Sequence, residues 1–279
     1  MILRPEPVII QGGMGAAVSS WQLARAVSQM GQMGVVSGTG LDVVLSRRLQ
    51  FGDLDGALRR AMAEFPLPEM IDPILDRYFI PGGKAPEKRF ISCPMPSMAP
   101  SQRHFELLVV SNFVEVYLAK EDHDGLVGIN YLEKIQVPTP ASLFGAMLAD
   151  VDYVLMGAGI PRAIPGILDR LSQSEPVEMP VNVYGADRDD NFVTRFDPEK
   201  FTHGDILTPK RPKFLAIVAS QTLATMLARK STGRVDGFVV EGPTAGGHNA
   251  PPRGAMQLND RAEPIYGDRD VPDLEVIRS

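Results

Sequence analysis

The chain has 279 residues, of which 44% are hydrophobic and 22% are charged. These fractions are typical of soluble globular proteins, so they exclude disordered, collagen-like and fibrous classes, and the length is enough for one barrel of about 250 residues. The formal net charge of -6 argues against a nucleic-acid partner, because negative charge repels a phosphate backbone.

Short β-branched runs alternate along the chain with longer segments of helical periodicity. The runs predict six strands, at 8–10, 33–36, 126–129, 152–156, 214–218 and 237–240. The periodic segments predict helices at 19–30, 53–65, 101–120, 139–147, 164–171 and 220–227. Two less regular segments, near 66–100 and near 173–213, are expected to be insertions within a single domain that spans 1–279.

Strands separated by helices predict parallel pairing through right-handed crossovers, in either an open doubly wound sheet or a (β/α) barrel. Small or polar residues follow nearly every strand, which favours the barrel, because barrels carry their functional residues on these exits. A barrel needs eight strands, and the only further candidates within the chain are Arg89–Ser92 and Val181–Tyr184. We therefore predict an α/β fold of the TIM-type barrel class, truncated after the sixth βα unit, with strands 7 and 8 absent.

Two glycine-rich turns match the dinucleotide-binding fingerprint only in part. Gly13-Met14-Gly15 and Gly157-Ala158-Gly159 each follow a predicted strand, but Val18 and Arg162 stand where the third glycine belongs. Tight turns of a barrel explain both segments without a dinucleotide.

The densest candidate for chemistry directly follows the last predicted strand, between Glu241 and His248. Glycines around a histidine let a ligand approach the backbone closely and leave the imidazole exposed in a cleft. Because an imidazole titrates near neutral pH, His248 is the candidate catalytic residue. The other histidines have no partner at metal-ligand spacing, so no metal site is expected.

The compartment follows from what the sequence lacks. Cys93 is the only cysteine, so no internal disulfide forms, and the first residues, MILRPEP, do not resemble a secretion signal. No apolar run approaches the roughly 20 residues that cross a bilayer. We expect a cytoplasmic protein that does not bind a membrane.

Four segments together resemble the nitronate monooxygenase family, formerly called 2-nitropropane dioxygenases: 8–15, 36–40, 127–130 and 241–248. The enoyl reductase branch of polyunsaturated fatty acid synthases is particularly similar, around 128–135 and 152–161. The resemblance implies a barrel that holds FMN at its carboxyl-terminal mouth without a metal, with His248 as the catalytic residue. The cofactor-binding residues would be Gly12, Gly13, Met14, Ser37, Gly38, Asn130, Ser220, Gly242, Gly246 and Gly247.

Three functions remain open on this resemblance. In the first, FMN accepts an electron from an alkyl nitronate and O2 completes the oxidation, with His248 as base or orienting group. In the second, NAD(P)H reduces FMN and an enoyl thioester is reduced, with His248 as proton donor. In the third, the chain is a non-catalytic barrel fragment or subunit that needs a partner chain.

Two departures from the family bear on these functions. Asn249–Pro252 stand where the family usually has a glycine two positions after the histidine, and the glycine-rich loops that hold the FMN phosphate would follow His248 on further strands. We therefore expect weak FMN binding, and either a homo-oligomer or a partner chain that completes the barrel.

Overall fold

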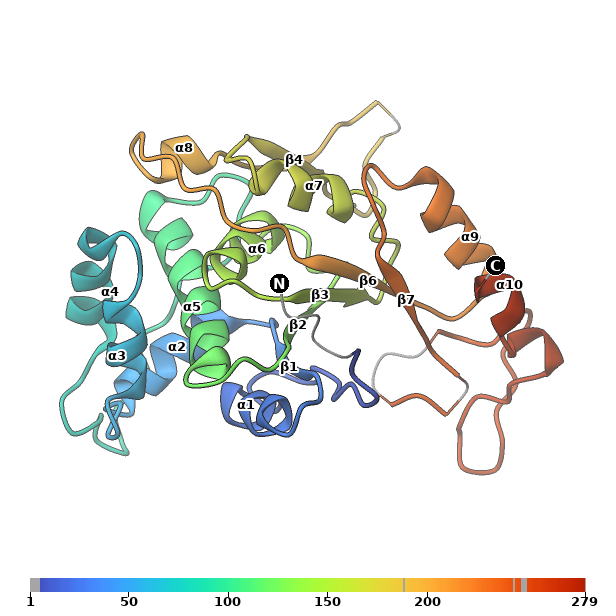
Figure 1. The fold of residues 1–279 in the computed structure, drawn as a ribbon, viewed down its shortest axis with the longest axis horizontal. Helices are drawn as coiled ribbons and strands as arrows, with labels where there is room; N and C mark the ends of the chain where they lie inside the picture. Colours follow the sequence, from blue (N-terminus) through green and yellow to red (C-terminus); the bar gives the residue numbers. More distant parts are fainter. Residues whose placement is uncertain (1–5, 188, 243, 247–249, 279) are drawn as a thin grey trace.

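A five-stranded, all-parallel sheet lies at the centre of the computed structural model, which describes residues 6–187, 189–242, 244–246 and 250–278 (Figure 1). The strands lie side by side in chain order, without the reversal that marks a doubly wound sheet. They are β1 (Gly34–Ser37), β2 (Val127–Leu132), β3 (Tyr153–Gly157), β6 (Lys213–Val218) and β7 (Gly237–Val240). The α/β class is confirmed, and closure into a barrel remains a prediction.

Five of the six expected strands are present, and the first is wrong. Residues 8–10 contribute only an isolated parallel bridge between Ile10 and Met33 at the edge of the sheet. Val8 is 90% exposed and Ile9 60% exposed, so little packing holds this segment against β1. The two spare candidates, Arg89–Ser92 and Val181–Tyr184, are not strands either.

The second insertion instead contains a separate antiparallel hairpin, in which β4 (Val177–Pro180) pairs with β5 (Val193–Phe196). The short helix α8 (Pro198–Phe201) follows it. Phe196 and Phe201 are buried in the main core, so this insertion packs onto the domain.

The helices have the following bounds: α1 (Trp21–Gln29), α2 (Leu41–Gln50), α3 (Ala57–Ala63), α4 (Ile71–Tyr78), α5 (Gln102–Lys120), α6 (Thr139–Leu148), α7 (Ile164–Leu171), α9 (Gln221–Lys230) and α10 (Leu274–Arg278), with short 3-10 turns η1 (Pro68–Met70) and η2 (Asp268–Asp270). Neither α2 nor α4 was expected. Helix α2 starts after Gly40, whose φ of 64° is a conformation that favours glycine. Helix α4 lies in the proline-rich insertion, where Pro73 occupies the first turn and is tolerated.

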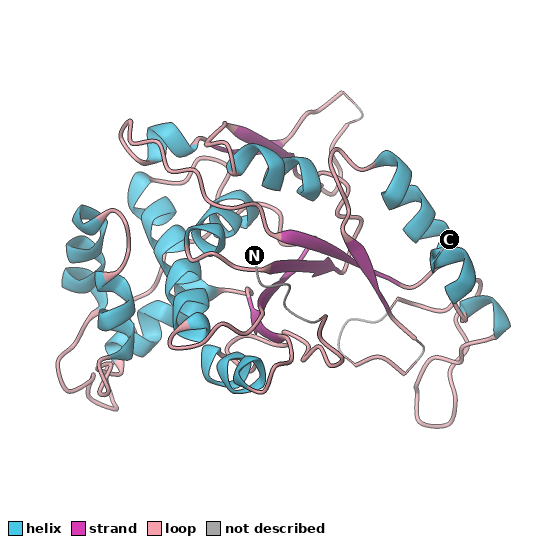
Figure 2. Ribbon diagram, viewed as in Figure 1, coloured by secondary structure: helices cyan, strands magenta, loops and turns pink. Residues whose placement is uncertain are grey.

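The two faces of the sheet bury different partners. One face packs on the helices through alternate residues such as Ile129, Val154 and Phe214, which belong to the main core. The other face carries a second cluster built on Met33, Val35, Tyr153 and Leu155, to which none of the described helices contributes a residue. Figure 2 shows the helices placed around the strands. Burial on both faces explains why these strands are continuous apolar runs.

The amino ends of the strands are joined by a repeated arrangement of charges. Asp152 precedes β3, and its carboxylate accepts the Val127 amide of β2 at 2.9 Å and the Lys120 ammonium at 3.1 Å. Asp236 precedes β7 and likewise accepts the Phe214 amide of β6 at 2.8 Å. Each aspartate therefore links the strand that it precedes to the neighbouring strand in the sheet, β3 to β2 and β7 to β6.

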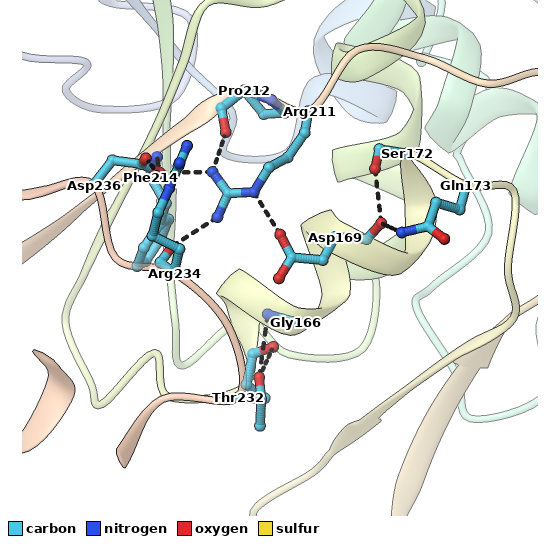
Figure 3. A network of polar contacts seen from close by, with 11 residues as sticks. Gly166, Asp169, Ser172, Gln173, Arg211, Pro212, Phe214, Thr232, Arg234 and Asp236 are labelled. Atoms are coloured by element: carbon cyan, nitrogen blue, oxygen red, sulfur yellow. Dashed lines mark hydrogen bonds and ion pairs between the residues drawn. The ribbon is translucent and has the colours of Figure 1, made fainter. Parts of the chain in front are cut away.

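Arg211 is one of two arginines that pair with the second of these aspartates, and Arg234 is the other, with its Nε 2.7 Å from the Asp236 carboxylate (Figure 3). The Arg211 guanidinium lies 2.6 Å from the Asp236 carboxylate and 2.5 Å from that of Asp169 on α7. It also donates to the Arg234 carbonyl at 2.6 Å. This network fastens α7 to the amino ends of β6 and β7, at the opposite end of the sheet from the predicted ligand-binding turns.

Candidate functional site

A cavity of about 580 Å³ lies at the carboxyl ends of the strands, on the face that the helices do not cover. This volume is within the range of about 300–1,000 Å³ for small-molecule sites. Five of the predicted cofactor-binding residues line it: Gly12, Gly13, Met14, Asn130 and Gly246. Apolar residues from the inner face of the sheet complete much of the wall, including Leu155, Ile217 and Val239.

Asn130 is placed in this cavity by the alternation of β2, because its neighbours Ile129 and Tyr131 both belong to the helix-facing core. The residue is only 9% exposed, and its backbone carbonyl accepts the Gly38 amide at 2.9 Å. Its side-chain amide has no hydrogen-bond partner among the residues that the structure describes. The amide is not one of the sealed, unpaired polar atoms of the core, and it lines the cavity, so it is available to a ligand.

The turn after residues 8–10 forms the opposite part of the wall. Gly13 is buried against the sheet, and a Cβ there would lie 2.7 Å from both the Val36 carbonyl oxygen and the Asn130 Cβ. Ser19 fixes the turn, because its hydroxyl accepts the Met14 amide and donates to the Gly12 carbonyl, both at 2.9 Å. The Gly13 amide itself has no acceptor within the described part of the chain, so a second donor is free at the cavity.

Ser37 and Gly38 do not line this cavity. The buried Ser37 hydroxyl donates to the Gly15 carbonyl, so it supports the turn from behind. Gly38 lies against the ring of Tyr131, which faces the helices.

Ser220 and Gly242 line a smaller neighbouring cavity of about 160 Å³. The Ser220 hydroxyl accepts the Leu223 amide at 3.2 Å and thereby caps α9, which confirms Ser220 as a helix cap. Arg253 and Asp270 line the same small cavity, so both signs of charge are present there.

Glu241 lines both cavities and is the only ionisable side chain among the described residues of the larger one. Burial raises the pKa of its carboxyl above the usual value, and no neighbouring cation among the described residues opposes this. We assigned Glu241 no role from the sequence. Residues two apart in a strand share one face, so Glu241, which lies two positions after the inward-facing Val239, could have been identified from the sequence as a residue of this cavity.

Gly247 and His248, the remaining predicted residues, lie outside the described residues. Within the described ranges, no three histidine, cysteine, aspartate or glutamate side chains gather where a metal could bind.

None of the helices in the described part of the chain has the length and apolar character needed to cross a membrane. No protein-family model matches the chain, and no curated protein matches it either.

Proposed function

We propose that the chain is an FMN-dependent oxidoreductase of the nitronate monooxygenase type, built on a barrel-like sheet. The observation that carries the proposal is the pair of unpaired polar groups in the cavity of about 580 Å³, the Asn130 amide and the Gly13 amide. They lie at the carboxyl ends of parallel strands, where α/β proteins bind their ligands.

The described lining fits the flavin ring better than the flavin phosphate. The apolar wall suits a planar aromatic system, and the two free amides suit its polar edge. The described lining has no lysine or arginine to hold a phosphate, and Arg253 lies in the small cavity beside Asp270.

The residues of this chain have separable roles in the proposal. FMN, when bound, supplies the electron transfer, while Asn130 and Gly13 orient it through hydrogen bonds. The inner-face residues Leu155 and Ile217 exclude water from the reacting atoms. His248, by the resemblance, removes or holds the substrate proton.

The visible absorption spectrum of the purified protein, with and without added FMN, tests the cofactor. We expect weak but measurable binding of added FMN, which turns the protein yellow, with affinity at least tenfold lower in Asn130→Ala and unchanged in Asn182→Ala, an exposed asparagine outside this cavity. A colourless protein that binds no added FMN would overturn the proposal and favour a non-catalytic subunit.

Turnover tests the reaction. We expect oxygen uptake with an alkyl nitronate, and a large loss of kcat in His248→Ala with the flavin retained. NADPH-dependent reduction of an enoyl thioester, without oxygen uptake on nitronates, would replace the proposed reaction by the enoyl reductase reaction.

A further inference from the structure

A second cavity, of about 410 Å³, adjoins the first. It is enclosed by the exit of β1, the start of α2, parts of α5 and α6, and the segment Phe90–Pro96 of the proline-rich insertion. Thr39 and Leu132 line both cavities. Thr39 lies just after β1, and Leu132 is the last residue of the neighbouring strand β2. A ligand whose head lies beside Asn130 therefore has room beyond these two side chains.

Phe90–Pro96, here called the cover segment, is held in place by a buried side chain. The side-chain Nε2 of Gln50 donates a hydrogen bond to the Ile91 carbonyl at 3.1 Å, and its side-chain Oε1 accepts one from the Ile91 backbone N–H at 2.6 Å. Gln50 is fully buried in α2. The second cavity is therefore a built part of the domain.

Three polar groups on the wall of the second cavity are paired within the protein. The Tyr131 hydroxyl donates to Asn112 at 2.7 Å, and the Asn112 amide donates to the Leu108 carbonyl at 2.9 Å. The Cys93 thiol lies 3.0 Å from the Ser46 hydroxyl. A polar ligand would compete with these bonds and gain little, whereas an apolar ligand leaves them intact.

Two charged side chains also line the second cavity. The Asp42 carboxylate lies 3.7 Å from Nε2 of the buried His104, and the exposed Arg47 stacks on the ring of Phe90. The inward carboxylate disfavours an anionic end of a ligand here. Most of the remaining wall is apolar, including Leu41, Ile91 and Leu108. The first cavity, with two unpaired amides, is therefore the polar head site, and the second is the apolar tail site.

We infer that the second cavity binds an uncharged apolar chain attached to the group that reacts in the first cavity. This inference rests on the proposed function for the identity of the reacting group. The binding of the chain itself depends only on the cavity beyond Thr39 and Leu132.

A binding experiment tests the chain without the cofactor. Calorimetric titration with primary alcohols from butanol to decanol should show affinity rising about fourfold per methylene until the cavity is filled. Ile135→Trp fills the second cavity and should weaken decanol binding at least tenfold. Ile160→Trp is the matched control, because Ile160 is likewise exposed but lines a separate cavity of about 300 Å³. Affinity independent of chain length, or equal losses in both variants, would overturn the inference.

A turnover experiment separates the inference from the proposed function. Across a series from ethyl to decyl nitronate, kcat/KM should rise with chain length, and the decyl-to-ethyl ratio should fall in Ile135→Trp and persist in Ile160→Trp. Turnover without any dependence on chain length would overturn the inference and leave the proposed function standing. If the protein fails to bind FMN but binds alcohols, and Ile135→Trp abolishes the alcohol binding, the proposed function is overturned and the apolar site is supported.

Discussion

The two ends of the parallel sheet differ in how their polar groups are satisfied. At the amino ends, Asp152 and Asp236 each accept a strand amide and pair with a cation. At the carboxyl ends, the side chains of Asn130 and Glu241 have no partner among the described residues, although both line a cavity. Polar groups thus stabilise the domain at one end and remain available for ligands at the other, a division typical of barrel proteins.

Removing a partner at the amino ends should have the largest effect on stability. Asp236→Ala leaves the Phe214 amide and the 16% exposed Arg211 side chain without their shared acceptor. We expect a loss of about 3 kcal/mol in the free energy of unfolding, measured by urea denaturation.

The control for this change is Glu178→Ala, which breaks an exposed ion pair with Arg195 on the hairpin. Exposed pairs contribute about 0–1 kcal/mol, so the control should change stability little. Equal losses in the two variants would remove the distinction between the two ends of the sheet.

A smaller effect is expected at the other aspartate. Asp152→Asn retains an oxygen that can accept the Val127 amide but loses the charge that pairs with Lys120. We expect a loss of about 1 kcal/mol, and the loss should shrink in high salt because Lys120 is partly exposed. A salt-independent loss would contradict an ionic contribution.

At the carboxyl end, Asn130→Ala should hardly change stability, by about 0.5 kcal/mol or less, because no protein hydrogen bond of the side chain is lost. Thermal unfolding of the ligand-free variant measures this. A loss of unfolding free energy as large as that of Asp236→Ala would show that the Asn130 side chain stabilises the fold and is not free to bind a ligand.

The smallest effect concerns pH. Burial raises the pKa of Glu241 in the folded protein, so this carboxyl favours folding below its unfolded pKa and loses that contribution as pH rises through its folded pKa. Glu241→Gln should match the unaltered protein at about pH 3 and be slightly more stable at about pH 8, where the carboxylate is ionised. Denaturation at both pH values measures the difference, and the opposite order would contradict the desolvation of Glu241.

The sequence identified β2, β3 and β6 because burial on both faces makes them continuous apolar runs. It did not reveal α2, whose Val43 and Val44 resemble a strand and whose start depends on the backbone of Gly40. Asn130 and the Gly12–Met14 turn were found because the exits of parallel strands meet at one edge.

The second cavity was not predicted, since segments far apart in the chain enclose it. Whether a polar side chain is paired within the protein also depends on tertiary contacts. The difference between the Asn112 amide, which is paired, and the Asn130 amide, which is free, is therefore absent from the sequence.

The way in which Gln50 holds the cover segment bears on how the second cavity can be altered by substitution. Gln50 forms two hydrogen bonds with the main chain of Ile91, whereas Met95, four residues further along the cover segment, is 83% exposed. Substitutions along 92–96 can therefore alter the width and depth of the tail site while its anchor stays fixed. Variants of this chain that keep Gln50 should therefore differ in preferred chain length without a change in the sheet.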